Sequence, residues 1–286
     1  MLLFLTNCDE EQPNDKYEVE HRIFDTMSIK AKELLANNKF TEAEIIFDKF
    51  NNTDTFNYSY LVLGGTIKLA VRKPGDAITF LSKAINLKPT DELYYHLGEA
   101  YMGVNQEENS LICINEAIKL NPNVASYYKI RADFYYRQKV YLMAIDDISL
   151  ALAVANKNEK SDLYARRASY KYTINDINGT LTDCDSAIMV DKNYFVPYIN
   201  KACYLIELKR NKEAVKTVDA AIKLGCTHSS AYYRRALAKY YSGDKDCLQD
   251  FKKAIELKDE EAIDYVDHCP DKALKEILLG YKRNVL

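Results

Sequence analysis

Little in this 286-residue sequence breaks a helix or marks a catalytic centre. It has only nine glycines and six prolines, which suits long helices better than a loop-rich fold. Glycine-rich phosphate loops and the G-x-S-x-G and H-E-x-x-H motifs are absent, and no nucleophile has a base at a recognisable spacing. The seven cysteines include no C-x-x-C pair, so we expect no metal and no cofactor. A net charge of −3 argues against nucleic-acid binding.

What the sequence does contain is a repeat. An alanine followed by isoleucine or leucine returns six times, at intervals of 33 to 36 residues, at Ala84, Ala117, Ala151, Ala187, Ala221 and Ala254. A second small residue returns with the same period, at Ala31, Gly65, Gly98, Ala132, Ala168, Ala202 and Ala236. Two helices that cross closely need a residue without bulk at the crossing. The two sets of positions therefore predict a stack of helix pairs.

The third repeat carries the fullest pattern, with Tyr94, Leu97-Gly98, Tyr101, Ile114, Ala117 and Pro122. This pattern resembles the tetratricopeptide repeat family. The resemblance implies an all-α, right-handed superhelical solenoid of about seven antiparallel helix pairs. The repeats would begin near residues 24, 58, 91, 125, 161, 195 and 229, and the array would cover residues 24–258.

Two further features lie within or after the array. Residues 259–286 lack the repeated small positions, and Leu274, Ile277 and Leu278 fall on one helical face. We expect one capping helix here, because the last repeat would otherwise expose its outer face. Residues 155–160 add two residues to the array and predict a longer surface loop.

The amino terminus suggests an exported protein. Residues 1–8 are apolar and end in Cys8, and an acidic stretch follows. This resembles the end of a bacterial lipoprotein signal, so residues 1–23 would be a signal remnant and tether, with lipid on Cys8, in the cell envelope. The basic segment that normally precedes such a signal is missing. A cytoplasmic protein with a frayed amino terminus is the alternative.

In this family the first helices of the repeats line a concave groove. Helical phase selects as candidate groove residues Tyr95, His96, Glu99, Lys129, Asp133, Tyr136, Arg137, Arg166, Tyr172, Asn200, Tyr233, Arg234 and Tyr240. Tyrosine and arginine are enriched at binding hot spots. They would suit an acidic or aromatic partner segment, although a solvated surface without a ligand is the alternative for each residue. Chaperone-binding family members clamp a terminal carboxylate with lysine and asparagine, but Asp133 follows Lys129 here.

The sequence thus predicts a non-enzymatic scaffold that binds a protein or peptide in the groove. The alternative is an envelope lipoprotein with a structural or assembly role, in which the outer helix faces matter. Carboxylates on the second helices, such as Asp147 and Asp183, are expected to be solvated.

Overall fold

The computed structural model describes residues 13–49 and 57–285, and these residues form sixteen α-helices and no strand. Successive helices pack as antiparallel pairs, which confirms the expected all-α architecture of stacked helix pairs. The helices belong to two compact units, residues 1–123 and 124–286.

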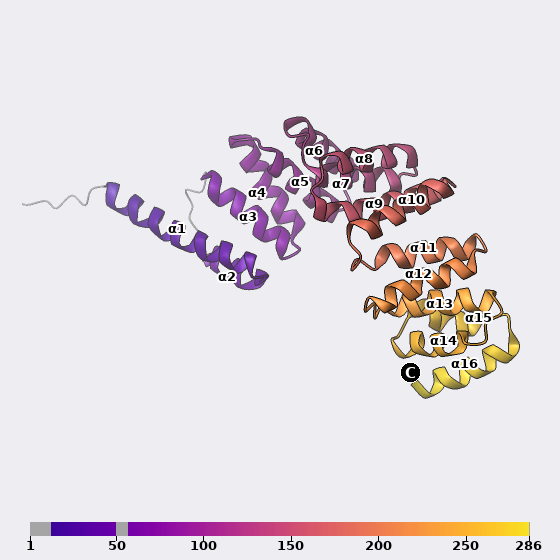
Figure 1. Cartoon of the computed structure of the whole chain (residues 1–286). Helices are drawn as coiled ribbons and strands as arrows, with labels where there is room; N and C mark the ends of the chain where they lie inside the picture. The colour runs from indigo at the N-terminus through magenta and orange to yellow at the C-terminus, as the bar shows by residue number, and fades with distance from the viewer. Residues whose placement is uncertain (1–12, 50–56, 286) are drawn as a thin grey trace, which may run out of the picture. The chain divides into compact units, whose positions relative to one another are not determined.

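The described residues of the first unit form three helix pairs, which Figure 1 labels α1 to α6. Its helices are α1 (Pro13–Ala36), α2 (Phe40–Lys49), α3 (Tyr58–Ala70), α4 (Pro74–Leu87), α5 (Asp91–Gly103) and α6 (Glu107–Leu120). Proline at the start of α4 and the Thr90 side chain at the start of α5 fix two of these beginnings. The starts of α3 and α5 agree with the repeat starts expected from the sequence.

The second unit contains the remaining ten helices. They are α7 (Ala125–Arg137), α8 (Tyr141–Val154), α9 (Lys157–Thr173), α10 (Ile177–Val190), α11 (Val196–Glu207), α12 (Asn211–Lys223), α13 (Ser229–Tyr241), α14 (Cys247–Glu256), α15 (Glu260–His268) and α16 (Lys272–Val285). From α7 to α14 the odd-numbered helices are the first helices of repeats, and the even-numbered ones are the second helices.

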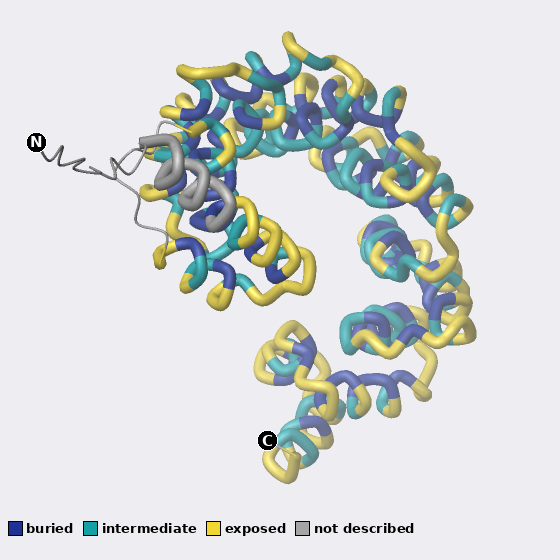
Figure 2. Tube along the Cα trace, turned by 90° about the vertical axis from the view of Figure 1, so that its left-hand side faces the viewer, coloured by how far each residue is buried: buried dark blue, intermediate teal, exposed yellow. Residues whose placement is uncertain are grey.

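The two sets of small residues lie where the helices touch. All six alanines of the recurring phrase are fully buried, and so are the small residues of the first helices. A Cβ atom added to Gly98 would lie 2.9 Å from Cδ1 of Ile114 in the paired helix. Figure 2 shows the same pattern along the chain, with buried segments on the helix faces that meet and exposed ones at the turns.

Two helices, α1 and α9, begin earlier than the sequence predicted. Helix α1 begins at Pro13, so residues 13–23, expected to belong to a tether, are helical; Cys8 lies outside the described residues. Of the residues 155–160 expected to form a loop, 157–160 are instead the first turn of α9, and Ala155 and Asn156 connect α8 to it. Asn156 caps this helix, and Glu159 bonds back to the Asn156 amide at 2.9 Å. This reciprocal capping box stabilises an extra helical turn.

The expected single capping helix is two helices, α15 and α16. Asp259 caps α15 through the Ala262 amide, and Pro270 lies in the short turn between the two helices. Val266 and Leu278 are both fully buried, in one core cluster that also contains residues of α13 and α14. Together they cover the last repeat, as one helix was expected to do.

Candidate functional site

The candidate groove residues of the first unit meet on one face of α5. Glu99 accepts a hydrogen bond from the Tyr95 hydroxyl at 3.1 Å, and its other oxygen lies 3.1 Å from Nδ1 of His96. Burial, with the nearby Glu99 carboxylate, raises the pKa of the Tyr95 hydroxyl well above its ordinary value of 10.0. Tyr95 therefore stays a neutral donor, and the three side chains form a small polar cluster.

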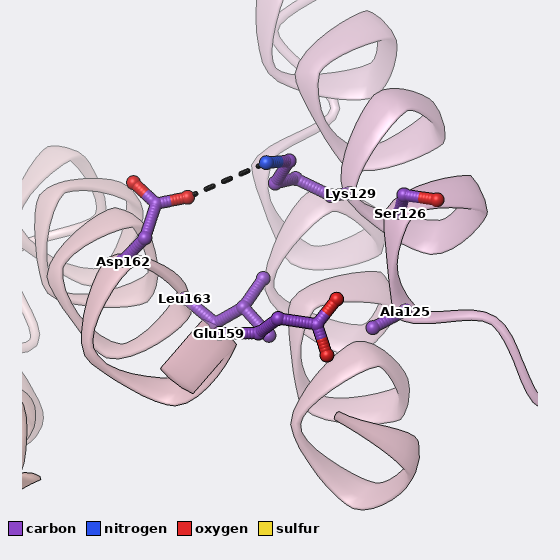
Figure 3. A pocket seen from close by; sticks show the side chains of 6 residues that line it. All are labelled: Ala125, Ser126, Lys129, Glu159, Asp162 and Leu163. Atoms are coloured by element: carbon purple, nitrogen blue, oxygen red, sulfur yellow. Dashed lines mark ion pairs between the residues drawn. The ribbon is translucent and has the colours of Figure 1, made fainter. Parts of the chain in front are cut away.

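In the second unit, four candidate or neighbouring side chains form one charged network across α7 and α9. Arg166 binds Asp133 at 3.0 Å and Oδ2 of Asp162 at 3.1 Å, and Nζ of Lys129 lies 3.5 Å from the same Asp162 oxygen. Figure 3 shows the Lys129–Asp162 pair over a shallow pocket between the two helices. Burial disfavours the charge of Arg166, but the two carboxylates outweigh it, and the pKa of the guanidinium is raised.

Two stacked tyrosine pairs extend this network. The ring of Tyr136 lies 4.4 Å from that of Tyr170, and the ring of Tyr172 lies 4.3 Å from that of Tyr204. In each pair the first ring is half-buried and the second is buried. The Tyr170 hydroxyl donates a short hydrogen bond to Asp133, which joins the Tyr136–Tyr170 pair to the charges. Burial raises the pKa of Tyr204 to about 12, so its hydroxyl stays protonated.

The network is electrically balanced. It contains two cations, Lys129 and Arg166, and two carboxylates, Asp133 and Asp162. The donor fork of Arg166 is thus occupied by the protein's own carboxylates, and the Arg234 guanidinium likewise binds Glu261 at 2.8 Å. The arrangement offers a partner two tyrosine faces with a neutral polar edge, rather than free positive charge.

The remaining candidates are dispersed. Tyr233 is 6% exposed, and its ring packs near Phe251 and Tyr265 in the core that α15 and α16 close. Tyr240 lines a separate apolar pocket with residues of α14 and α16. Arg137 is exposed and Asn200 half-buried. The structure therefore brings together Lys129, Asp133, Tyr136 and Arg166, with Tyr172 on the same helix as Arg166.

The structure also corrects the expectation for the carboxylates of the second helices. Asp147 and Asp183 are buried, and each accepts two hydrogen bonds from an arginine of the paired helix, Arg131 or Arg167. Asp250 does the same with Arg235. The signal lies in the sequence, where each aspartate follows its arginine by 15 or 16 residues. These pairs are core elements of their repeats.

Within the described residues, no group of histidine, cysteine and carboxylate side chains could hold a metal ion. None of the helices described is both long enough and apolar enough to span a bilayer.

Comparison with known proteins agrees with this geometry. Residues 91–124, which include α5 and α6, match the tetratricopeptide repeat model. A tetratricopeptide repeat protein from Parabacteroides merdae superimposes with a TM-score of 0.62 and 16% identity, over 92% of this chain and 100% of that one. One helix pair of the chain thus matches the tetratricopeptide repeat model, and the fold resembles that of a solved tetratricopeptide repeat protein. Such repeats are generally scaffolds for protein–protein interaction.

Two other proteins are similar over parts of the chain. YrrB, described as having an unusual peptide-binding site, has a TM-score of 0.50 and 20% identity, over 70% of this chain and 97% of its own. A DnaJ homolog subfamily C member 7 homolog from Dictyostelium discoideum is 33% identical over 92 residues, 32% of this chain. That match spans only 17% of the length of the relative.

Proposed function

We propose that the second unit binds an extended peptide segment of a partner protein across the ring faces of Tyr136 and Tyr172. The observation that carries the proposal is that each of these half-buried rings is stacked on a buried tyrosine. A ring held in this way loses little conformational freedom on binding. Tyrosine also supplies apolar area and a hydroxyl, which is why it is frequent at binding hot spots.

The chemistry of the partner follows from the charges. Because Asp133 and Asp162 already bind Arg166, an acidic peptide would have to displace a carboxylate from the guanidinium. We therefore favour an apolar or aromatic segment over the acidic one that the sequence also suggested. The likeness to YrrB, whose structure is described as having a peptide-binding site, supports peptide binding in general.

The experiment is a capture of partners from the native organism by the wild-type chain, compared with Tyr136→Ala and Tyr172→Ala. Loss of a hot-spot ring costs about 2 kcal/mol, or roughly thirtyfold in affinity. Tyr135→Ala is the control, because Tyr135 neighbours Tyr136 on α7 and packs edge-on against Phe134 instead. Equal recovery of the same partners by all the variants, each folded by circular dichroism, would exclude this surface.

Two further parts of the proposal rest on the sequence. We propose a binding role without catalysis, since the sequence contains none of the catalytic motifs sought. We also propose that Cys8 anchors the protein in a bacterial envelope through lipid. In that case the outer helix faces could contribute a structural or assembly role.

A further inference from the structure

A hollow that is open to solvent lies between the start of α14 and the first half of α16. Its volume is about 940 Å³, whereas the shallow pocket beside Lys129 and Asp162 has a volume of about 130 Å³. Leu248 of α14 and Leu274 and Ile277 of α16 line its apolar side. Ligand sites in proteins have volumes of about 300–1,000 Å³ and mostly apolar walls. The hollow is thus large enough to take a side chain of a partner together with its neighbours.

The floor of this hollow is held in place by the core. Leu248, Leu274 and Tyr240 pack against the buried cluster that joins α13, α14, α15 and α16, and Cys247 belongs to that cluster. Ile277, at the rim, is 50% exposed although it is large and apolar. A ligand that covers an exposed apolar side chain beside such a floor orders few flexible groups of the protein, so it binds at a low entropic cost.

Two neighbouring tyrosines at the end of α13 form a second wall. The ring centroids of Tyr240 and Tyr241 are 5.3 Å apart, and the ring planes are inclined by 60°. Cations lie over several other tyrosine rings, for example Arg235 over Tyr232 at 5.9 Å. In the part of the chain that the structure describes, no cation lies over Tyr240 or Tyr241. Their ring faces are therefore available to a cation of a ligand, which the ring quadrupole attracts.

Two carboxylates belong to the rim, Asp244 in the turn before α14 and Asp271 in the turn before α16. Oδ1 of Asp244 accepts a hydrogen bond from the Asp246 amide at 2.9 Å, and Oδ1 of Asp271 accepts one from the Leu274 amide at 3.0 Å. Among the described residues neither carboxylate has an ion-pair partner, so Oδ2 of each remains for a ligand. Lys245, which is exposed, is the only cation of the described residues that line the hollow. Two carboxylates and one ammonium group give this lining a net charge of −1 at neutral pH.

The rings and the carboxylates lie within reach of one another. Asp244 follows Tyr241 within a single turn of the chain. Burial, and after it the Asp271 carboxylate, raise the pKa of the Tyr240 hydroxyl above its ordinary value of 10.0, so Asp271 lies near this ring. A group that enters the hollow therefore meets aromatic faces, carboxylate oxygens and apolar side chains together.

We propose that this hollow binds an arginine side chain of a partner protein, together with the apolar residues that flank the arginine in the partner's sequence. A guanidinium stacks on aromatic rings and donates a planar fork of hydrogen bonds to carboxylates. The flanking apolar residues cover Leu274 and Ile277, and the charge of the lining disfavours an acidic segment. The site shares no residue with the surface of Tyr136 and Tyr172, so this inference goes beyond the proposed function and does not rest on it.

The test uses a capped pentapeptide, acetyl-Gly-Leu-Arg-Leu-Gly-amide, titrated into the full chain by isothermal calorimetry. A matched peptide has citrulline in place of arginine, which keeps the shape of the side chain and removes its charge. The arginine peptide is expected to bind at least about tenfold more tightly, because it alone gains the cation–π and charge-assisted contacts. Equal binding of the two peptides, or no heat of binding with the arginine peptide at millimolar concentration, would overturn the proposal. This comparison needs no variant of the protein.

Two variants test whether this hollow is the site. Asp271→Asn and Tyr241→Leu should each weaken binding of the arginine peptide by about three- to thirtyfold, since one removes a charge and the other an aromatic face. Asparagine still caps α16, and leucine keeps apolar area, so both variants should fold. Binding of the citrulline peptide should change little, whereas a merely structural defect would weaken both peptides alike.

Asp246→Asn is the control for these variants. Asp246 is exposed in the same turn as Asp244 and does not line the hollow, so its replacement removes a nearby charge without touching the site. If Asp271→Asn has no more effect than Asp246→Asn, or if both peptides lose affinity equally, the hollow is not the arginine site.

Discussion

Arg167 of α9 and Asp183 of α10 form a two-bonded ion pair, with Nε and Nη2 of the guanidinium 2.9 and 2.8 Å from the two carboxylate oxygens. Lys171, one turn further along α9, contacts the same carboxylate at 2.9 Å. The Asp183 side chain is 3% exposed. Arg167 therefore neutralises the carboxylate of Asp183, which lies between the two helices and is almost inaccessible to water.

Replacing Asp183 with asparagine should destabilise the protein markedly. It leaves Arg167 and Lys171 without their carboxylate, and breaking a buried pair in this way costs about 3–5 kcal/mol. Urea unfolding followed by circular dichroism measures the loss. Asp185→Asn is the matched control on the same helix, because Asp185 is 55% exposed and its pair with Lys201 should contribute less than about 1 kcal/mol. Equal losses in both variants would contradict the buried role of Asp183.

Glu44 should make the stability of the first unit depend on pH. Hydrogen bonds from Lys68, at 2.6 Å, and from Lys73 outweigh burial and lower the pKa of this carboxyl below 4.5. A lowered folded pKa means that the stabilisation is complete above about pH 4.5 and is lost as the pH falls through the folded value.

Glu44→Gln should accordingly be less stable than the wild type by about 2 kcal/mol at pH 7, with the gap closing in acid. Urea unfolding of the full chain from pH 7 to pH 3 gives the comparison. Glu42→Gln, on the same helix and 57% exposed, should change little at any pH. A gap that stays constant with pH would rule out this titration.

Leu278 should be the residue through which α16 stabilises the stack. It is fully buried against α14 and α15, whereas its neighbour Ile277 is 50% exposed. Leu278→Ala should cost about 2–5 kcal/mol in thermal or urea unfolding. Ile277→Ala should cost clearly less, because half of the side chain is already in water. Similar losses for the two variants would mean that α16 packs differently.

Cys8 should carry lipid in the native host. With labelled palmitate, the full-length gene is expected to give a labelled band, and Cys8→Ser should abolish it. Cys203→Ser, at a partly exposed cysteine of α11, should retain the label. A wild-type band without label would favour the cytoplasmic alternative.

The repeat architecture could be predicted because it depends on local spacing. Gly98 and Ala117 mark where helices must approach, and such small positions leave a period in the sequence. The burial of Asp147 and Asp183 could not be predicted in the same way. A carboxylate looks solvated on a helical wheel until the arginine of the paired helix is placed beside it.

The candidate site was predicted in part for a similar reason. Phase along the first helices selected Lys129, Asp133, Tyr136 and Arg166, which the structure brings into one network. It did not reveal that Asp133 neutralises Arg166, because that bond joins consecutive repeats. Tyr233 was misjudged because helical phase within α13 does not show that α15 covers it.

The short sequence distance between the partners of each buried ion pair has a consequence for synthesis on the ribosome. Arg131 and Asp147 are 16 residues apart, so this pair can close soon after its two helices have emerged. Such local contacts favour rapid folding, in order, from the amino terminus. The last repeat is different. Phe251 and Ile255 belong to a core cluster that includes Leu278, so this cluster is complete only after Leu278 has been synthesised. A nascent chain that stalls just before this point would present an open apolar edge to chaperones.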